Sequence, residues 1–156
     1  MYELAKPWRD FDKYKRDRLK EALYEAELAE EFLKNGLYKN AAGKAFQAVK
    51  AYLAAVATEK REALAQYYPG ERTVQKKKVA VVDLLIAYMP TTRMKEVAAR
   101  LGDRELELVV EKALDLHQFQ YNGLDREFSR YTTLEIVERD IKDVVEFVKR
   151  RVTSGT

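Results

Sequence analysis

The feature of this sequence that most constrains its fold is an alanine-rich segment over residues 37–64, which follows an Asn35-Gly36 turn. No proline interrupts the segment, and its small residues are Ala41, Ala42, Gly43, Ala45, Ala48, Ala51, Ala54, Ala55 and Ala57. Small side chains let neighbouring helix axes approach to the short end of the usual packing range of roughly 8–10 Å. The pattern therefore predicts a long helix at the centre of a bundle, paired with the helix before the turn in an αα-hairpin.

Amphipathic segments on either side of this helix supply the rest of the expected fold. Apolar residues recur at helical spacing over residues 19–33, 104–121 and 134–152, which predicts three more long helices. Shorter helices are expected over residues 79–89 and 93–101. A strand over residues 79–82 is the alternative, but the period of about 3.6 residues that continues to residue 89 favours a helix. Short connections favour antiparallel neighbours. The predicted fold class is all-α: an antiparallel up-and-down four-helix bundle with one or two short extra helices.

Capping and breaking residues set the expected boundaries of these helices. Gly102 is expected to close the helix over residues 93–101, and Asp103 is expected to be the N-cap of the next one. Thr132 and Glu135, three residues apart, predict a capping box that opens the last helix. The strongest break in the chain is the Pro-Gly pair at residues 69–70,.

The length and composition indicate one folded domain. A chain of 156 residues can bury a single core, and we expect a domain over residues 1–152 followed by a disordered tail over residues 153–156. No apolar run approaches the ~18 residues of a membrane span, and the N-terminus lacks the apolar core of a signal peptide. We therefore expect a cytoplasmic protein without membrane contact. Abundant Lys, Arg and Glu with few Asn, Gln and Cys suggest a thermophilic source.

The composition excludes several kinds of chemistry. The chain has no cysteine and one histidine, which argues against a zinc site and a thiol nucleophile. We therefore predict no metal and no cofactor. Glu107, Glu111 and Asp115 form an acidic row, but no histidine lies three residues after any of them, so a solvated helix face explains the row better than a di-iron site.

The net charge of +3, from 29 basic and 26 acidic residues, means that a nucleic acid would have to be recognised by a local patch. Two basic groups qualify as candidates: Lys76–Lys78 with Arg72, and Arg126 with Arg130. Either group can bind phosphates electrostatically. An ordinary solvated surface explains them equally well.

The single histidine, His117, is the main candidate for chemistry. It falls on the apolar stripe of its helix with Tyr121 one turn later, so both side chains are expected to face the core. His117 is either a hydrogen-bonded core or interface residue or a general acid/base with a pKa near neutral. Tyr121 either shares a hydrogen-bond network with His117 or packs against it. We favour the packing interpretation for both.

Two stretches of the sequence resemble a known family. The run Phe-Leu-Lys-Asn-Gly-Leu-Tyr-Lys-Asn-Ala-Ala-Gly-Lys-Ala at residues 32–45 is similar to the first helix pair of the HEPN superfamily. The pattern Leu-His-x-Phe-x-Tyr-x-Gly at residues 116–123 resembles its archaeal PaREP-type branch. The resemblance implies an antiparallel helical bundle, usually a homodimer. It also implies members that act as metal-independent RNases or as companions of nucleotidyltransferases in toxin–antitoxin or defence systems.

The resemblance also implies a catalytic motif, which this chain lacks. Active members of the family share an arginine followed by the histidine with four to six residues between them, where the arginine holds the phosphate and the histidine moves the proton. Here the only cation at that spacing before His117 is Lys112, and lysine lacks the bidentate guanidinium fork. We therefore expect a non-catalytic HEPN-like interaction module that binds RNA, a nucleotide or a nucleotidyltransferase, with His117, Tyr121, Arg126 and Arg130 as candidate ligand-binding residues. The alternatives are an RNase that uses His117 and a purely structural oligomer.

Overall fold

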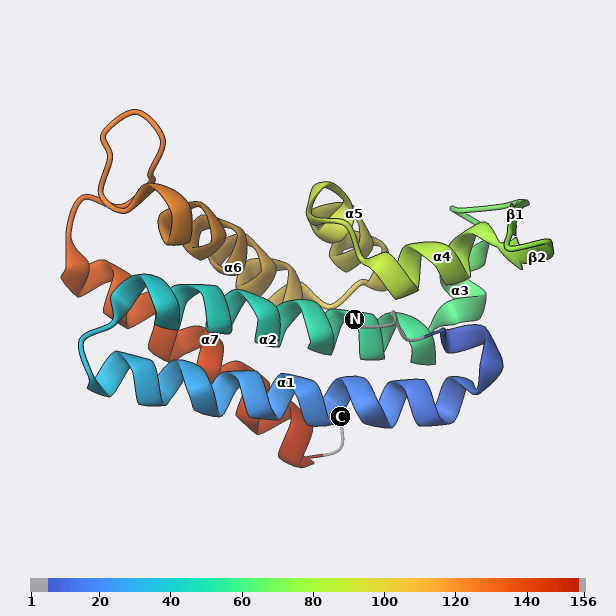
Figure 1. Cartoon of the computed structure of the whole chain (residues 1–156), viewed down its shortest axis with the longest axis horizontal. Coiled ribbons are helices and arrows are strands. Elements are labelled where there is room, and N and C mark those ends of the chain that lie inside the picture. The colour runs from blue at the N-terminus through green and yellow to red at the C-terminus, as the bar shows by residue number, and fades with distance from the viewer. Residues whose placement is uncertain (1–5, 155–156) are drawn as a thin grey trace.

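The computed structural model describes residues 6–154, and most of this part of the chain is helical (Figure 1). Its elements are η1 (Pro7–Arg9), α1 (Phe11–Lys34), α2 (Tyr38–Glu59), α3 (Arg61–Ala65), β1 (Glu71–Val74), β2 (Lys77–Ala80), α4 (Val81–Tyr88), α5 (Thr91–Leu101), α6 (Arg104–Asn122) and α7 (Leu134–Ser154). The strands pair antiparallel in a two-stranded sheet. Residues 1–5 and 155–156 lie outside the described residues, so the expected domain and tail boundaries there are not addressed.

The alanine-rich helix α2 is the most buried element of the fold. Its alanines are at most 2% exposed, and α1, α6 and α7 all pack against it. Figure 1 shows α2 between α1 and α6, with α7 behind. The largest side chains of α2, Phe46, Tyr52 and Leu53, fill the space between these helices. The predicted central position of this helix is correct.

The β-hairpin is the main departure from the predicted all-α fold. Residues 71–74 pair with residues 77–80, so the helix expected from residue 79 begins only at Val81. The two turn residues, Gln75 and Lys76, have φ of 49° and 67°. Left-handed φ at both central positions is the requirement of a two-residue hairpin turn that normally carries Asn-Gly. The usual sequence signal for a hairpin is therefore absent, and the prediction missed it.

The expected helix over residues 37–64 is broken in two. The helix α2 ends at Glu59, and α3 starts at Arg61. The Thr58 hydroxyl donates a 2.8 Å hydrogen bond to the carbonyl of Ala54, an arrangement that bends helices. Arg61 then donates to both carboxylate oxygens of the buried Asp83 in α4. This ion pair fixes α3 against α4 and so positions the hairpin that lies between them in sequence.

Most of the predicted caps are present, with one shift. Gly102 has a left-handed φ of 73°, and the Asp103 carboxylate accepts a hydrogen bond from the backbone N–H of Leu106 at 3.1 Å. At the last helix the hydroxyl that accepts from a backbone N–H belongs to Thr133, with Ile136 as the donor, so the capping residue is one later than predicted. The helix continues through Ser154, two residues into the segment expected to be a tail.

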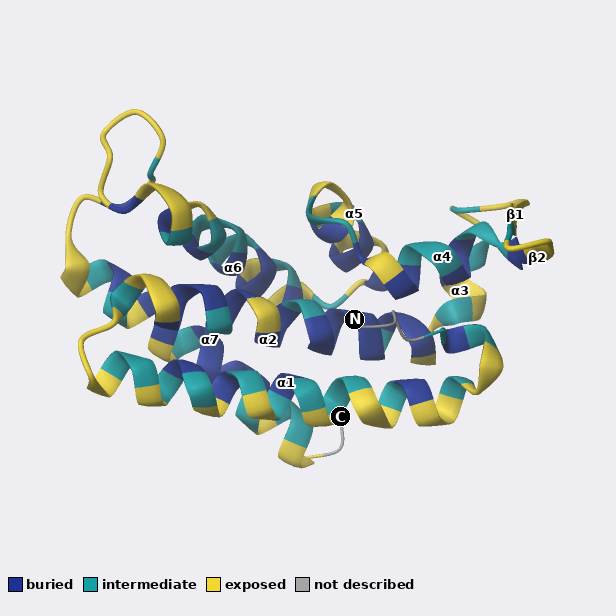
Figure 2. Cartoon of the chain, in the orientation of Figure 1, coloured by how far each residue is buried: buried dark blue, intermediate teal, exposed yellow. Residues whose placement is uncertain are grey.

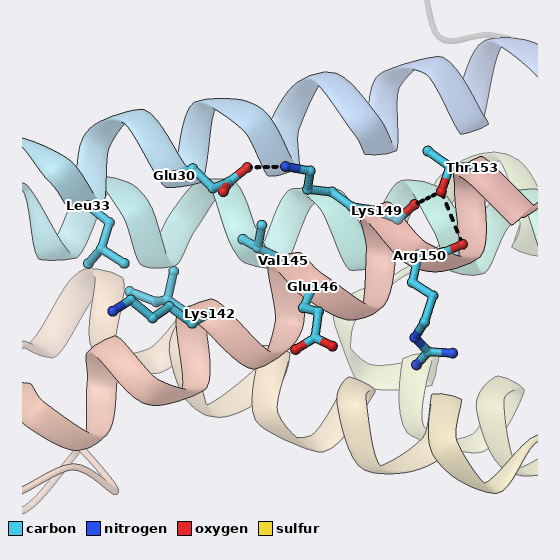
Figure 3. Close-up of a pocket in the computed structure, with 9 residues that line it drawn as sticks. Glu30, Leu33, Lys142, Val145, Glu146, Lys149, Arg150 and Thr153 are labelled. Carbon is cyan, nitrogen blue, oxygen red and sulfur yellow. Dashed lines mark hydrogen bonds and ion pairs between the residues drawn. The ribbon is translucent and has the colours of Figure 1, made fainter.

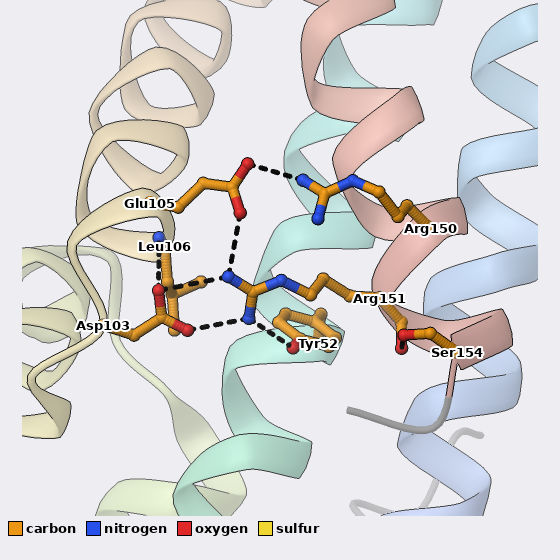
Figure 4. Close-up of polar contacts among 7 residues, drawn as sticks. All are labelled: Tyr52, Asp103, Glu105, Leu106, Arg150, Arg151 and Ser154. Atoms are coloured by element: carbon orange, nitrogen blue, oxygen red, sulfur yellow. Dashed lines mark hydrogen bonds and ion pairs between the residues drawn. The ribbon is translucent and has the colours of Figure 1, made fainter.

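An ion-pair network at the start of α6 ties α7 to the rest of the fold (Figure 4). Arg151 donates to both carboxylate oxygens of Asp103, at 2.7 and 3.2 Å, and to Glu105 at 2.9 Å. It also donates to the Tyr52 hydroxyl at 3.3 Å. Hydrogen bonding to Arg151 lowers the pKa of Asp103. Because Asp103 also caps α6, one carboxylate links the start of α6 to the end of α7.

Candidate functional site

His117 lies on the side of α6 that faces α2. Its ring stacks on Phe46, with the centroids 4.1 Å apart and the planes inclined by 26°. Tyr121 contacts the His117 ring edge-on at 5.3 Å. The histidine is partly buried, whereas Tyr121 is 70% exposed. The expectation that both side chains face the core is therefore wrong for Tyr121, because the last turn of α6 is exposed at this position.

The surroundings of His117 favour its neutral form. Burial lowers the pKa of His117, and the positive charge of Lys50 on α2 lowers it further. The buried Nδ1 atom has no hydrogen-bond partner among the described residues. The pKa of Lys50 is itself lowered, first by burial and then by the charge of Arg18 on α1. A neutral imidazole beside a lysine is an arrangement that can accept a proton.

Lys112, the cation at the family spacing, is on a different side of α6. It lies five positions before His117, which corresponds to about 140° around a helix. Its ammonium group lies 2.7 Å from Asp143 and 3.9 Å from Asp140, both on α7. Asp140 also accepts a 2.7 Å hydrogen bond from the hydroxyl of Tyr131. The structure therefore does not bring Lys112 and His117 into one site, and the lysine near His117 is Lys50.

The two other candidate cations lie in the loop between α6 and α7. Arg130 is 74% exposed and pairs with Asp115 at 3.3 Å. Arg126 is exposed, and no ion pair forms at its side chain within residues 6–154. No hydrogen bond, ion pair or ring contact joins either arginine to His117 or Tyr121 in this part of the chain. The four candidate ligand-binding residues therefore do not form one site: His117 and Tyr121 contact each other on α6, and the two arginines lie apart from them in the loop.

A groove of about 770 Å³ runs beside Tyr121 between α1, α2 and the end of α6. On its floor Gly43 lets α6 approach closely, because a Cβ at residue 43 would lie 2.5 Å from the Gln120 side chain. Lys44 and Glu25, which also line the groove, pair at 3.2 Å. Gln120 and Glu25 were not predicted as site residues. The glycine inside the alanine face was the available signal for the close approach.

A second groove, of about 570 Å³, separates α1 from α7 (Figure 3). Glu30 on α1 and Lys149 on α7 bridge it with a 2.7 Å ion pair. The apolar part of its lining comes from Leu33, Ile141 and Val145. None of the candidate residues from the sequence lines this groove.

Neither metal-binding clusters nor membrane spans are found in the described part of the chain. Between residues 6 and 154, no three His, Asp or Glu side chains are grouped so that they could hold an ion. None of the helices in that range has the length and apolar character needed to cross a bilayer.

The fold and the His117 site define a mostly helical protein whose histidine, on α6, stacks on Phe46 of α2. The chain belongs to the archaeal PaREP1/PaREP8 family, which it matches over residues 17–145. Comparison with curated proteins and with solved structures gives no match. The family description names no activity and no ligand.

Proposed function

We propose that this protein is a non-catalytic, HEPN-like interaction module whose four long helices form the bundle typical of that superfamily. Its partner is an RNA, a nucleotide or a nucleotidyltransferase, and it works in the cytoplasm of a thermophilic archaeon, within a toxin–antitoxin or defence system. The assignment to archaea rests on the family match. The cytoplasmic and thermophilic parts rest on the composition and on the lack of long apolar runs. The interaction module, its partners and its system rest on the resemblance of residues 32–45 and 116–123 to HEPN proteins.

The observation that carries the non-catalytic assignment is that Lys112 and His117 lie on different sides of α6. A phosphate-cleaving pair needs its cation and its histidine at one phosphate. Lys112 is instead engaged by Asp143 and Asp140 of α7, while His117 stacks on Phe46 of α2. Lys50, which is near His117, supplies a point charge without the bidentate fork of arginine.

A cleavage assay tests this assignment. We expect no metal-independent RNA cleavage in EDTA by the wild-type protein, and the same absence for His117→Ala. Cleavage that leaves a 2′,3′-cyclic phosphate, and that disappears in a normally folded His117→Ala variant, would contradict the proposal.

The proposal includes a homodimer formed at the end of the molecule where α6 stops. Five large apolar side chains that are 41–70% exposed occur there, in the α1–α2 turn, the last turn of α6, the following loop and the start of α7: Leu37, Tyr121, Leu124, Phe128 and Leu134. Grouped apolar exposure of this kind marks protein interfaces. A second copy of the chain is the occupant that the family resemblance implies.

Light scattering at micromolar concentration tests the dimer. We expect Phe128→Ser to give a monomer, because it replaces a 61% exposed aromatic ring in the middle of this group. Leu108→Ser is the matched control, since Leu108 is 55% exposed but lies near the other end of α6. A monomeric wild-type protein would rule out this part of the proposal.

A metal-independent RNase is the second candidate function. It is favoured by the neutral His117 with an unpartnered Nδ1 atom and by the nearby positive charge of Lys50. In such an enzyme His117 would act as general base and Lys50 would hold the phosphate. General acid/base groups contribute about 10²–10⁴-fold, so His117→Ala would lower the rate by at least about 10²-fold.

A purely structural oligomer is the third candidate. It predicts oligomers by light scattering but no RNA or nucleotide binding, and no nucleotidyltransferase recovered in a pull-down from the source organism. Recovery of a nucleotidyltransferase would favour the interaction module.

A further inference from the structure

Residues of the β-hairpin, α4 and α5 line a hollow of about 530 Å³. In Figure 1 the hairpin and α4 lie at the end of the molecule away from the α6–α7 loop. Tyr67 and Tyr88, which line it, are 46% and 57% exposed. Arg72 from the hairpin and Arg93 from α5 line the same hollow. The side chains therefore bring aromatic rings and guanidinium groups together at one opening.

The hairpin carries the charge excess of the whole chain. Residues 70–80 contain four basic residues (Arg72 and Lys76–Lys78) and one acidic residue, Glu71. Their excess of three equals the net charge of the chain, so the remaining residues hold 25 basic and 25 acidic groups. All four cations are exposed, and Figure 2 shows the hairpin mostly in the colour of exposed residues. None of the four forms an ion pair within residues 6–154. Free, clustered cations on an otherwise balanced molecule define a local anion-binding surface.

The one acidic group that lines the hollow is already engaged by its neighbours. The Glu96 carboxylate accepts a 2.8 Å hydrogen bond from the Tyr68 hydroxyl and lies 3.4 Å from Arg93. Burial, together with the hydrogen bond to Glu96, raises the pKa of Tyr68 to about 12. Arg100 lies 4.3 Å from the centroid of the Tyr67 ring, which holds that ring at the rim. The Tyr67 and Tyr68 side chains that line the hollow are therefore held in place by these contacts, and the negative charge of Glu96 is already paired.

We propose that this surface, formed by Tyr67, Tyr88, Arg72, Arg93 and Lys76–Lys78, binds single-stranded nucleic acid. The lysines and arginines contact phosphates, and bases stack on the exposed tyrosine rings, the combination that recognises unpaired strands. A duplex keeps its bases stacked on one another and leaves the rings unused. An acidic protein would match the cations but not the rings. The inference rests on the proposed function, in which RNA is one partner class, and it assigns that contact to the hairpin end.

The test is fluorescence anisotropy with labelled 12-nucleotide U-RNA and T-DNA over a range of salt concentrations. We expect both single strands to bind the full chain. Replacing the lysines at 76, 77 and 78 by glutamine is expected to raise Kd at least about tenfold at low salt. Each lost phosphate contact changes the slope of log K against log salt by about 0.7 for single strands, so the slope should shrink by about 2. A matched triple variant, Lys13→Gln with Lys34→Gln and Lys142→Gln, removes the same charge elsewhere and should bind as the wild type.

A second variant pair tests the stacking contribution. Tyr88→Ala is expected to raise Kd about fivefold or more with an unchanged salt slope, while Tyr88→Phe retains the ring and the affinity. Because Tyr88 is exposed, both variants should melt as the wild type does. Preference for RNA over DNA, or the reverse, would identify the natural strand and support the proposal in either case.

Three results would overturn the inference. The first is an equal loss of affinity in the hairpin and control triple variants. The second is tighter binding of a duplex than of the single strands, and the third is competition by polyglutamate as strong as competition by U-RNA. RNA cleavage in EDTA would instead refute the non-catalytic function and leave the mapping of the binding surface intact. A nucleotidyltransferase partner with no dependence of strand binding on the hairpin would refute the inference alone.

Discussion

The two ends of the molecule differ in what they expose. Where α6 stops, the surface shows apolar side chains such as Tyr121 and Phe128, next to the partly buried His117. At the hairpin end it shows unpaired cations with two tyrosine rings. The 22-residue α2 runs between them, a length of about 33 Å. That separation exceeds the Debye length of roughly 8 Å at physiological salt. Charge changes at one end therefore leave the electrostatics of the other nearly unchanged, so the proposed dimer contact and the proposed strand binding should be independent of each other.

The largest expected effect is at the hairpin end. Asp83 is 3% exposed and receives two hydrogen bonds from Arg61. Asp83→Ala leaves a partly buried guanidinium without this partner. We expect the variant to have a free energy of unfolding lower by about 3 kcal/mol. This is near the lower bound for a broken buried ion pair, because Arg61 is not fully buried. Chemical denaturation measures it. Glu62→Ala, which removes the exposed neighbour of the same arginine, should have little effect. An equal loss in both variants would show that the buried pair does not anchor this end.

The next effect concerns the other end. His117→Ala removes a ring that stacks on Phe46, and we expect a loss of about 1–3 kcal/mol from the cavity and the lost contact. Tyr121→Ala, at a 70% exposed position on the same helix, is the control and should change stability much less. Thermal melts compare the two. If the Tyr121 variant is the less stable one, the packing role assigned to His117 is wrong.

A smaller effect, of opposite sign, is expected at the hairpin turn. Gln75→Asn with Lys76→Gly replaces two residues in left-handed conformation by the pair that this turn prefers. We expect the variant to be more stable by about 1 kcal/mol through relief of backbone strain, although it removes one cation. A higher melting temperature with weaker strand binding would show that Lys76 lowers stability at the turn but contributes to strand binding. Unchanged stability would mean that the turn carries no strain.

The smallest effect is a pH dependence of stability that arises at one end only, because the single histidine of the chain, His117, is far from the hairpin surface. The folded-state pKa of His117 is lowered below its ordinary value of 6.5, so protonation favours the unfolded chain. Its contribution to stability is complete above about pH 6.5 and is lost as the pH falls below that value toward the folded pKa. Wild type should therefore lose stability relative to His117→Gln between about pH 7 and about pH 5. Parallel pH profiles of the two proteins would contradict this assignment.

The candidate site was predictable in part. The helical spacing correctly placed His117 on the helix face toward its neighbour, and it grouped Tyr121 with it. The contact with Phe46 and the nearby Lys50 belong to α2, about 70 residues earlier in the chain, and no local pattern links them. The position of Lys112 could not be predicted from its spacing in the sequence either. Its spacing from His117 matches the family motif in length, but the rotation of α6 turns it toward Asp143.

The sequence by itself determined the elements whose signals are local. A buried α2 follows from the small residues 41–57, and the ends of α5 and α6 follow from Gly102 and Asp103, because helical periodicity and capping depend on residues within one or two turns. Only the tertiary structure decided the rest. The Arg61–Asp83 pair accompanies the break after α2 and anchors α4, and packing around Val79, which is 5% exposed, offsets the strain of the Gln75-Lys76 turn. These features depend on contacts between distant segments, whose energies exceed the weak local preferences of the residues involved.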